Sequence, residues 1–454
     1  MTDSAAPPEP ASAPDPTTVI KSRSYMALLL LGALIGVPVA TVAYFFLDAV
    51  SKIQTEIFTD LPKDLGFHGE PLWWPLPWLA LSGVLVALAI RYLPGTGGHE
   101  PSEGFKSAGP VQPVELFGIV AAALATLSLG VVLGPEAPLI AIGSGLGVLA
   151  IHLVKRDAPP MAAVVIGAAG SFAAIATLLG SPLVGAFLLM EMAGLGGPMM
   201  EIVLVPGLLA AGVGSLIFVG LNSLTGFGSF SLTVSSIPHV GAPNGVEFLW
   251  AIAIGMGAAV VATGIFKLAT MLRPLVERSR VLLTPVVGLA VAGLAIAFAA
   301  GTGRSSSEVL FSGQSALPSL VQQAAGWTVG ALLLLLICKG LAYAISLSSF
   351  RGGPIFPSMF IGAAGGIALS HVGGLPMIAG AAMGVGAMIA GALKMPFTAV
   401  LLPSLLFVSD AVTLMPLVIV AVVVSYVIAV WIKPSPPPAD APAQVPAPAP
   451  ASHG

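Results

Sequence analysis

The sequence contains few charged residues and a single cysteine. Asp, Glu, Lys and Arg make up 8% of the 454 residues, whereas soluble proteins carry roughly a quarter. Cys338 alone excludes an intramolecular disulfide and a cysteine metal cluster. None of the six histidines is followed by another four residues later, so the zinc-binding helix motif is lacking and we expect no cofactor. The net charge of −3 argues against nucleic acid as a partner.

Apolar residues dominate instead, because 56% of the chain is hydrophobic and the mean hydropathy is +1.00. A helix needs about 20 apolar residues to cross a bilayer. Apolar runs lie at 25–47, 73–93, 114–133, 138–154, 161–179, 182–194, 200–220, 245–270, 281–300, 325–347, 357–371, 376–392, 396–409 and 411–432. Some are short and contain Gly or Pro, as in helices that break inside a protein-lined cavity. We therefore predict an all-α multi-pass membrane protein with tilted and broken helices.

Both ends of the chain are predicted to be disordered and cytoplasmic. Residues 1–21 and 433–454 are rich in Pro and Ala and cannot bury a core. Lys21 and Arg23 precede the first apolar run and Lys433 follows the last, which places both termini inside by the positive-inside rule. No soluble domain is expected beyond these tails.

One stretch places a carboxylate inside the apolar sequence. Residues 134–147 read Gly-Pro-Glu-Ala-Pro-Leu-Ile-Ala-Ile-Gly-Ser-Gly-Leu-Gly, with Glu136 between two prolines. Pro138 is compatible with the first turn of a helix, because the amide that it lacks would be unpaired there. The sequence therefore predicts a helix start at this point, followed by close packing through the glycines.

A second copy of this stretch predicts two related halves. Residues 353–366 read Gly-Pro-Ile-Phe-Pro-Ser-Met-Phe-Ile-Gly-Ala-Ala-Gly-Gly, and six of the fourteen aligned positions match residues 134–147. Paired short segments in two halves are typical of transporters built from inverted repeats, with the binding site at the repeat interface. The predicted membrane domain, 22–432, then comprises a first repeat at about 25–220, a linker at about 221–244 and a second repeat at about 245–432.

The motifs resemble those of a known family, the CLC chloride channels and proton-coupled chloride exchangers. Gly134-Pro-Glu-Ala-Pro138 resembles its Gly-Arg-Glu-Gly-Pro motif, and Gly352-Gly-Pro-Ile-Phe-Pro-Ser-Met-Phe-Ile-Gly362 resembles its Gly-Gly-x-Phe-x-Pro-x-Leu-x-x-Gly motif. Pro94-Gly-Thr-Gly-Gly-His99 is similar, more weakly, to its Gly-Ser-Gly-Ile-Pro motif. The resemblance implies an inverted-repeat helical fold in the cell membrane, a homodimer, and one pathway per subunit for chloride or another small monovalent anion.

Glu136 is the main candidate for a gate. A charged side chain inside a membrane is by default a functional candidate. Burial opposes its ionisation while helix N-termini favour the anion, so the group could exchange protons near neutral pH. In the family that the motifs resemble, this glutamate competes with chloride and gates the pathway. The alternative is a glutamate that only complements a helix dipole.

Helix N-termini also supply the predicted anion site. Their unpaired amides bind an anion without a fixed cation, which keeps the binding weak enough for passage. The threonine at position 96 matches the family's anion-coordinating serine, although it could equally be an ordinary loop residue. The candidate anion-binding residues are Thr96, Gly97, Glu136, Ala137, Ile355 and Phe356.

A second glutamate, Glu191, matches the position of the family's inner proton-relay glutamate. The alternative is a helix-end carboxylate that faces the cytoplasm. Among the other charges, Lys339 lies near the edge of an apolar run, where snorkelling would explain it. Arg351 precedes a short helix and could add positive potential to the pathway, but a solvent-facing loop position is the expected account.

Four differences from the family pattern affect the functional prediction. Pro135 replaces the arginine, Ala137 replaces a glycine, Ile355 stands where the aromatic is usual with Phe356 beside it, and the tyrosine of the final helix is missing. The two glutamates favour anion transport as a proton-coupled chloride exchanger. A passive chloride channel of the same fold is the alternative, and an intramembrane enzyme that uses either glutamate as acid–base is a remote one, since no catalytic partner motif accompanies them. We therefore do not expect an enzyme.

Overall fold

The computed structural model describes residues 20–105, 109–194, 197–226, 232–234 and 239–432. The segments predicted as disordered tails lie almost wholly outside the described residues, as does part of the predicted linker. Within the described part every regular secondary-structure element is a helix. The one β-type pairing there is an isolated bridge between Gly134 and Gly353. The all-α prediction is confirmed.

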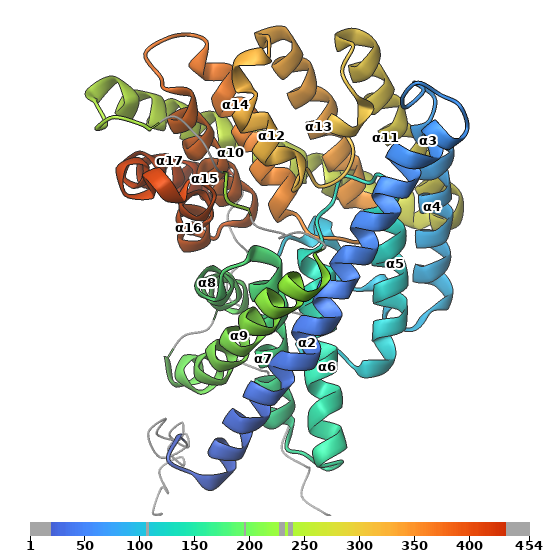
Figure 1. Ribbon diagram of the computed structural model, residues 1–454, viewed down its shortest axis with the longest axis vertical. Coiled ribbons are helices and arrows are strands. Elements are labelled where there is room, and N and C mark those ends of the chain that lie inside the picture. Colours follow the sequence, from blue (N-terminus) through green and yellow to red (C-terminus); the bar gives the residue numbers. More distant parts are fainter. Residues whose placement is uncertain (1–19, 106–108, 195–196, 227–231, 235–238, 433–454) are drawn as a thin grey trace, which may run out of the picture.

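The apolar runs correspond to helices (Figure 1). In the first half these are α2 (Arg23–Thr55), α4 (Pro75–Tyr92), α5 (Leu116–Ser128), α6 (Glu136–Val154), α7 (Pro160–Leu179), α8 (Pro182–Ala193) and α9 (Gly197–Thr225). In the second half they are α10 (Gly245–Arg278), α11 (Arg280–Thr302), α13 (Val329–Ser349), α14 (Ile355–Ser370), α15 (Met377–Leu393), α16 (Pro396–Leu406) and α17 (Ala411–Ile432). Short turns fill the connections: η1 (Glu56–Asp60), α3 (Leu61–Asp64), η2 (Pro94–Gly97), η3 (Pro101–Glu103), η4 (Pro113–Glu115), η5 (Ser306–Glu308), α12 (Ala316–Gln322), η6 (Ala324–Gly326) and η7 (Val408–Asp410).

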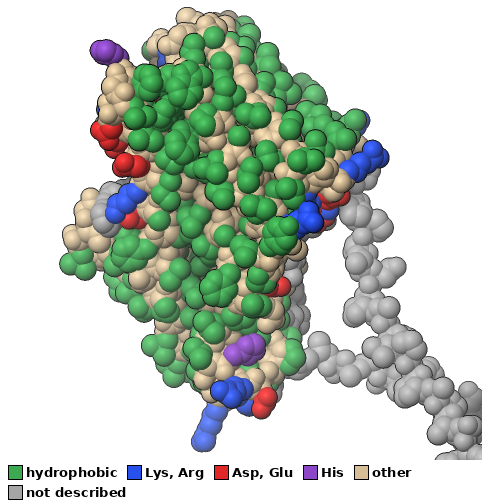
Figure 2. All heavy atoms as spheres, turned by 90° about the vertical axis from the view of Figure 1, so that its right-hand side faces the viewer, with side chains coloured by type: hydrophobic (Ala, Val, Ile, Leu, Met, Phe, Trp, Pro, Cys, Tyr) green, Lys and Arg blue, Asp and Glu red, His purple; other side chains and the backbone are tan. Residues whose placement is uncertain are grey.

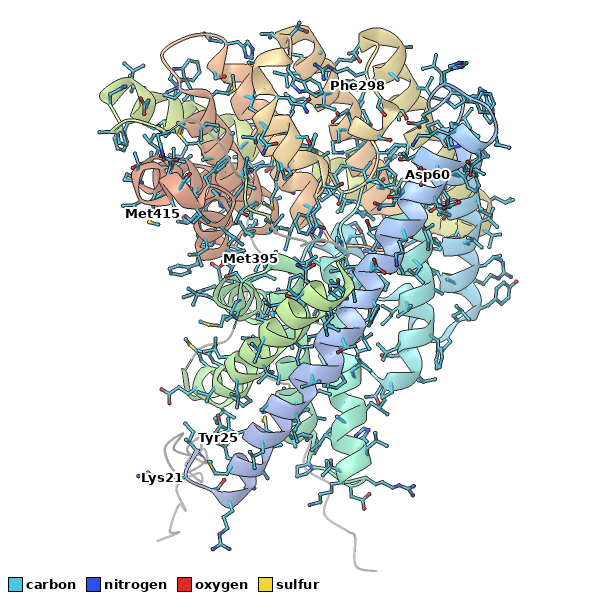
Figure 3. All side chains as sticks on the ribbon, in the orientation of Figure 1. Lys21, Tyr25, Asp60, Phe298, Met395 and Met415 are labelled. Atoms are coloured by element: carbon cyan, nitrogen blue, oxygen red, sulfur yellow. The ribbon has the colours of Figure 1, made fainter. Side chains whose placement is uncertain are left out.

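The helices fit a membrane in length and in surface. Among the described residues, nine helices are long and apolar enough to cross a bilayer, and five further apolar helices are shorter. Figure 2 shows one face covered largely by hydrophobic side chains, with the charged ones in a few groups mostly toward its edges. Such a face is stable against lipid rather than water. The helix α2 crosses much of the molecule, from Tyr25 at its lower end upward in the direction of Asp60, which lies in η1 (Figure 3).

The same packing is repeated in the two halves. The helix α6 packs on α7, and α14 packs on α15. At equivalent positions, a Cβ on Gly143 would collide with the backbone oxygen of Gly170, and a Cβ on Gly362 would collide with the backbone oxygen of Gly384. These glycines allow each helix pair to approach at backbone distance, as small residues do in membrane proteins. The chain thus has two inverted structural repeats, as its duplicated motif predicts.

Two cations lie deeper in the protein than the sequence predicts. The side chain of Lys339 is fully buried, so the snorkelling interpretation is wrong. Arg351 is only 4% exposed, so the expected solvent-facing position is wrong as well. A residue's position near the edge of an apolar run does not indicate whether loops from elsewhere in the chain bury its side chain. Both residues have internal partners that compensate for their burial.

Candidate anion-binding site

The two duplicated motifs meet through a short backbone bridge. The N–H of Gly134 donates to the carbonyl of Gly353 over 2.7 Å, and the N–H of Gly353 donates to the carbonyl of Gly134 over 2.5 Å. Two residues after the bridge on each side, the helices α6 and α14 begin. Pro138 lies in the first turn of α6, where its missing amide leaves no bond unmade. The structure therefore brings two helix N-termini from opposite repeats to one place.

Glu136, the first residue of α6, places its carboxylate on the N-terminus of α14. Its Oε1 accepts a hydrogen bond of 2.8 Å from the backbone N–H of Phe356, the second residue of α14. The side chain is fully buried, and its Oε2 makes no hydrogen bond to any described residue. The carboxylate thus rests on one amide with its other oxygen unpaired.

The glycines of the bridge make room for this carboxylate. A Cβ built on either Gly134 or Gly353 would collide with Oε2 of Glu136. A side chain at either position would have to displace the carboxylate or separate the two backbones. The duplicated glycine is thereby explained by close approach of a side chain rather than by backbone conformation.

The electrostatics of the site come from the backbone. The first turn of α14 has unpaired N–H groups, and the aligned peptide dipoles give its N-terminus a partial positive charge. No ion pair between described residues includes Glu136. The arrangement holds a negative charge through dipoles alone, which suits an ion that must also leave.

Tyr343, on α13, contacts the start of α14 through its hydroxyl. Its hydroxyl donates to the carbonyl of Pro354 over 2.9 Å and lies 3.3 Å from Oγ of Ser358. The hydroxyl of Ser358 donates to the same carbonyl over 2.8 Å. Sequence reasoning missed this tyrosine, although a polar aromatic residue in the apolar run just before the second motif was a signal for it.

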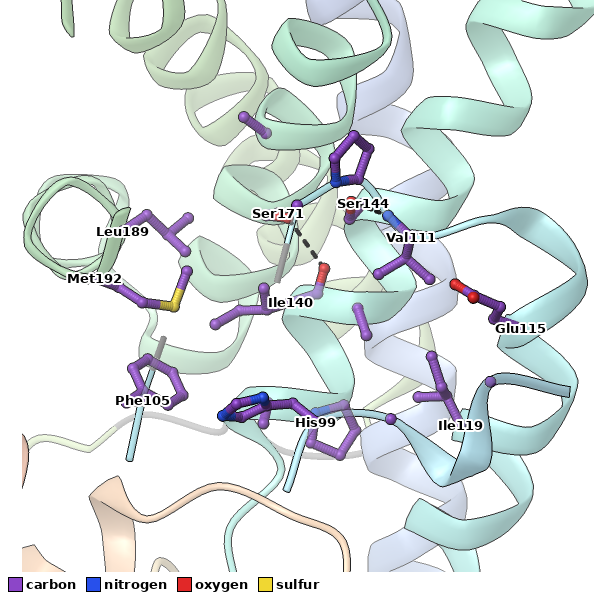
Figure 4. A pocket seen from close by; sticks show the side chains of 18 of the residues that line it. His99, Phe105, Val111, Glu115, Ile119, Ile140, Ser144, Ser171, Leu189 and Met192 are labelled. Carbon is purple, nitrogen blue, oxygen red and sulfur yellow. Dashed lines mark hydrogen bonds between the residues drawn. The ribbon is translucent and has the colours of Figure 1, made fainter. Parts of the chain in front are cut away.

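The other predicted anion-binding residues lie on a neighbouring cavity of about 530 Å³ (Figure 4). Thr96, Gly97 and Ala137 line it, whereas Glu136, Ile355 and Phe356 do not. The candidates are therefore divided: the carboxylate and the start of α14 are buried, and the threonine loop faces the cavity. The two groups adjoin through Ala137, which follows Glu136 directly.

The threonine loop has an unusual backbone. Thr96 has a φ of +48°, which is uncommon outside glycine, and it stands within the turn η2. Its carbonyl accepts a hydrogen bond of 3.3 Å from Nε of Arg351. Since Arg351 directly precedes the second motif, this bond ties the loop to the start of α14.

Arg351 belongs to a network of charges centred on Glu100. Its Nη2 lies 2.8 Å from a carboxylate oxygen of Glu100, and Arg273 and Arg280 approach the same carboxylate at 2.6 and 3.2 Å. Partial burial alone would raise the pKa of Glu100, but the guanidinium of Arg351 and its two neighbours outweigh that effect and lower it. The network remains ionised at neutral pH and joins the first repeat to the second.

Glu191, near the end of α8, binds the N-terminus of a different helix, α16. Its Oε1 accepts from the backbone N–H of Phe397 over 2.8 Å. Its Oε2 accepts from the backbone N–H of Thr398 over 2.7 Å and from the hydroxyl of Thr398 over 2.6 Å. Neither the proposed proton relay nor the alternative of a helix-end carboxylate that faces the cytoplasm anticipated these contacts. Met192, the next residue, lines the same cavity as Ala137.

Comparison with known sequences gives the family. A profile of the family described as voltage gated chloride channel matches residues 12–203 and 86–430. The chain belongs to this CLC family. It is 31% identical over 364 residues to a protein of Salmonella choleraesuis strain SC-B67 that is provisionally described as ion-transport protein YfeO, with 78% of this chain and 84% of the relative covered. The YfeO protein of Salmonella typhimurium strain LT2 is 30% identical over the same length and coverage.

Solved structures share the fold at lower sequence identity. The crystal structure of a slow cyanobacterial Cl-/H+ antiporter superposes with a TM-score of 0.70 at 21% identity, covering 90% of this chain and 95% of that one. A CLC-type fluoride/proton antiporter gives 0.65 at 20% identity, with 89% and 95% covered. Family and fold together make this CLC protein a multi-pass membrane protein for anion transport, and its apolar helices agree with that conclusion.

Proposed function

We propose that the protein exchanges chloride, or another small monovalent anion, for protons, with Glu136 as the gate. The observation that carries the proposal is the buried carboxylate on the start of α14, bound by a single amide. As an anion, the side chain occupies the position that a transported anion would take. Protonation would remove its charge and its attraction to the helix dipole, and so release the position.

Glu191 is proposed as the inner proton acceptor. It directly precedes Met192, which lines the cavity next to Ala137, and we propose this cavity as the route of protons toward the gate. The proposed subunit is one half of a homodimer in the cell membrane, with both termini in the cytoplasm. These assignments follow the family resemblance and the positive charges at the ends of the apolar region.

A passive anion channel is the second candidate, and one observation favours it. Both oxygens of Glu191 are engaged by amides and a hydroxyl of α16, so this carboxylate has the contacts of a helix cap. A cap that never releases its donors would not relay protons. The anion site at Glu136 would then serve conduction without coupling.

The purified protein in liposomes tests the proposal. An outward chloride gradient is imposed with no pH gradient, and external pH and chloride are recorded together. Exchange predicts that chloride efflux drives protons into the liposomes, against the gradient that builds up. Chloride efflux without proton movement would establish the channel, and the absence of flux for chloride, fluoride and nitrate alike would refute anion transport. Empty liposomes provide the baseline.

A further inference from the structure

The ammonium group of Lys339 fills a cage of backbone carbonyls. Its Nζ lies 3.0 Å from the carbonyl oxygens of Glu308, Val309 and Leu310 and 3.3 Å from that of Phe311. An ammonium has three protons, so these four acceptors share them. The surroundings are those that a pore offers to a dehydrated cation, here supplied to a tethered one.

This cage requires a cation to persist. Four carbonyl dipoles that point at one centre repel one another, and an unpaired buried acceptor costs about 1–3 kcal/mol. The loop also contains Phe311 with a φ of +60°, a conformation that a bulky residue rarely adopts. The lysine therefore determines the conformation of residues 308–311 as much as the loop buries the lysine.

The loop held by Lys339 is bound to the segment that leads to the gate. The backbone N–H of Phe311 donates to the carbonyl of Gly130 over 3.2 Å. A Cβ built on Gly130 would lie 3.5 Å from the side chain of Leu310, so the two residues are close neighbours. From Gly130 the chain runs without helix to the bridge at Gly134 and then to Glu136.

The same loop is bound to the other element of the site. The ammonium of Lys339 stands 4.4 Å from the ring centre of Phe360, on α14, in a cation–π contact. Gly313, just beyond the cage, faces that ring so closely that a Cβ there would approach it to 2.7 Å. One ammonium thus contacts the loop and α14, while the loop contacts the segment that carries Glu136.

We propose that Lys339 is a positioning residue for the anion gate: by holding the carbonyls of residues 308–311 and the ring of Phe360, it fixes the carboxylate of Glu136 relative to the N-terminus of α14. The inference rests on the proposed function of Glu136. It assigns to Lys339 no contact with the transported anion, and its effect passes through the loop and Gly130.

The first test removes the ammonium and keeps the apolar part of the side chain. In Lys339→Met the cage has no cation. We expect the half-saturating chloride concentration to rise about tenfold or more, because losing one buried hydrogen bond changes an equilibrium constant by about that factor. Hydrogen exchange in the same sample is expected to speed up in residues 308–316 and also in 130–135. The matched control is Lys267→Met, an exposed lysine on α10, which should change neither quantity.

Chemical rescue separates positioning from general destabilisation. Lys339→Ala keeps Cβ, and the atoms removed correspond to n-propylamine, whose neutral form crosses membranes. Adding n-propylamine is expected to restore both the chloride affinity and the slow exchange, whereas n-propanol, which lacks the charge, should not.

Three outcomes would overturn the proposal. One is normal chloride affinity in Lys339→Met together with fast exchange in residues 308–316, because the loop would then not act on the gate. Another is fast exchange in the loop without any change in residues 130–135. The third is failure of both variants to fold even with amine. If the wild-type protein carries no anion, the proposed function fails, while hydrogen exchange still decides whether Lys339 couples the loop to the gate segment.

Discussion

Two glutamates of the first repeat each bind the start of a helix of the second repeat, but in different ways. Glu136 on α14 is fully buried, accepts one backbone hydrogen bond and leaves one oxygen unpaired. Glu191 on α16 is partly buried and accepts three hydrogen bonds, one of them from a side chain. Both carboxylates therefore bind a helix N-terminus, but Glu136 is held by fewer hydrogen bonds than Glu191.

The difference follows from the neighbouring residues. Glu136 lies against Gly134 and Gly353, which provide space but no side-chain donors. Glu191 meets Thr398, whose hydroxyl adds a donor at 2.6 Å beside the amides. A carboxylate with few bonds can leave when it is protonated, whereas one with both oxygens hydrogen-bonded is held in place. We thus expect the side chain of Glu136 to move on protonation and that of Glu191 to stay bound to α16.

The largest effect is expected from neutralising the loosely held carboxylate. Glu136→Gln keeps an oxygen that can accept from the N–H of Phe356 but removes the charge and the proton exchange. We expect anion flux to become independent of pH and proton coupling to be lost, because the gate would be fixed in its neutral form. Chloride and proton fluxes in liposomes between about pH 4 and 7.5 measure both changes, because this range runs from the ordinary glutamate pKa of about 4.3 up to neutral pH.

The control for this variant is another buried glutamate with one unpaired oxygen. Glu247, on α10, accepts from the side chain of Asn244 over 2.6 Å, and its Oε2 has no partner among the described residues. Glu247→Gln should keep the wild-type pH dependence. If Glu136→Gln keeps it too, the carboxylate of Glu136 is not the gate, and the contrast between the two glutamates loses its functional meaning.

An intermediate effect is expected from removing the space beside the gate. In Gly353→Ala, the new methyl would occupy the position of Oε2 of Glu136 and push the carboxylate away from Phe356. We expect the pH dependence of flux to weaken and the chloride affinity to change by about tenfold, which corresponds to about 1.4 kcal/mol. Gly365→Ala on the same helix is the control, because its Cβ would lie 4.0 Å from the nearest side chain, that of Leu336.

A double variant decides whether the methyl acts through the carboxylate. With Glu136 already changed to Gln, the pH dependence should be absent whether residue 353 is Gly or Ala, and the two changes should not add. A further change in pH dependence from the methyl alone would place a second titrating group near the bridge. The glycine would then matter for a reason other than room for Glu136.

Much of this arrangement could be predicted from the sequence, because it is local or duplicated. The prolines and glycines of residues 134–147 predict the start of α6, and the copy at 353–366 predicts a matching start for α14. The hydropathy of the runs predicts the helices between them. Each of these signals depends on neighbours within one or two helical turns, so no knowledge of distant contacts is needed.

The contacts that complete the site connect distant residues and are not visible in the sequence. Glu191 and Thr398 are 207 positions apart, and nothing near Glu191 indicates a helix N-terminus as its partner. The burial of Lys339 depends on a loop that folds over it, so its position in an apolar run favoured snorkelling instead. Thr96 was predicted to bind the anion, and its place on the cavity and its positive φ are features that the sequence alone does not indicate.

The smallest effect, and the one that sharpens the comparison most, is expected at the firmly held glutamate. Glu191→Gln loses the charge and part of the acceptor capacity at α16, and Thr398→Val loses only the hydroxyl bond. From the usual contribution of such bonds, we expect losses of about 1–3 kcal/mol and about 1 kcal/mol in the free energy of unfolding. Thermal or denaturant unfolding in detergent measures both, and equal losses would show that the charge adds nothing to the cap.

Proton coupling in the same two variants separates a relay from a cap. If Glu191 accepts protons, Glu191→Gln abolishes proton movement while Thr398→Val, which retains the carboxylate, keeps it. If Glu191 only caps α16, both variants keep the wild-type ratio of protons to anions and differ in stability alone. The second result would leave Glu136 as the one of these two glutamates that takes part in proton exchange. The hydrogen bonds between Glu191 and α16 would then have a structural role only.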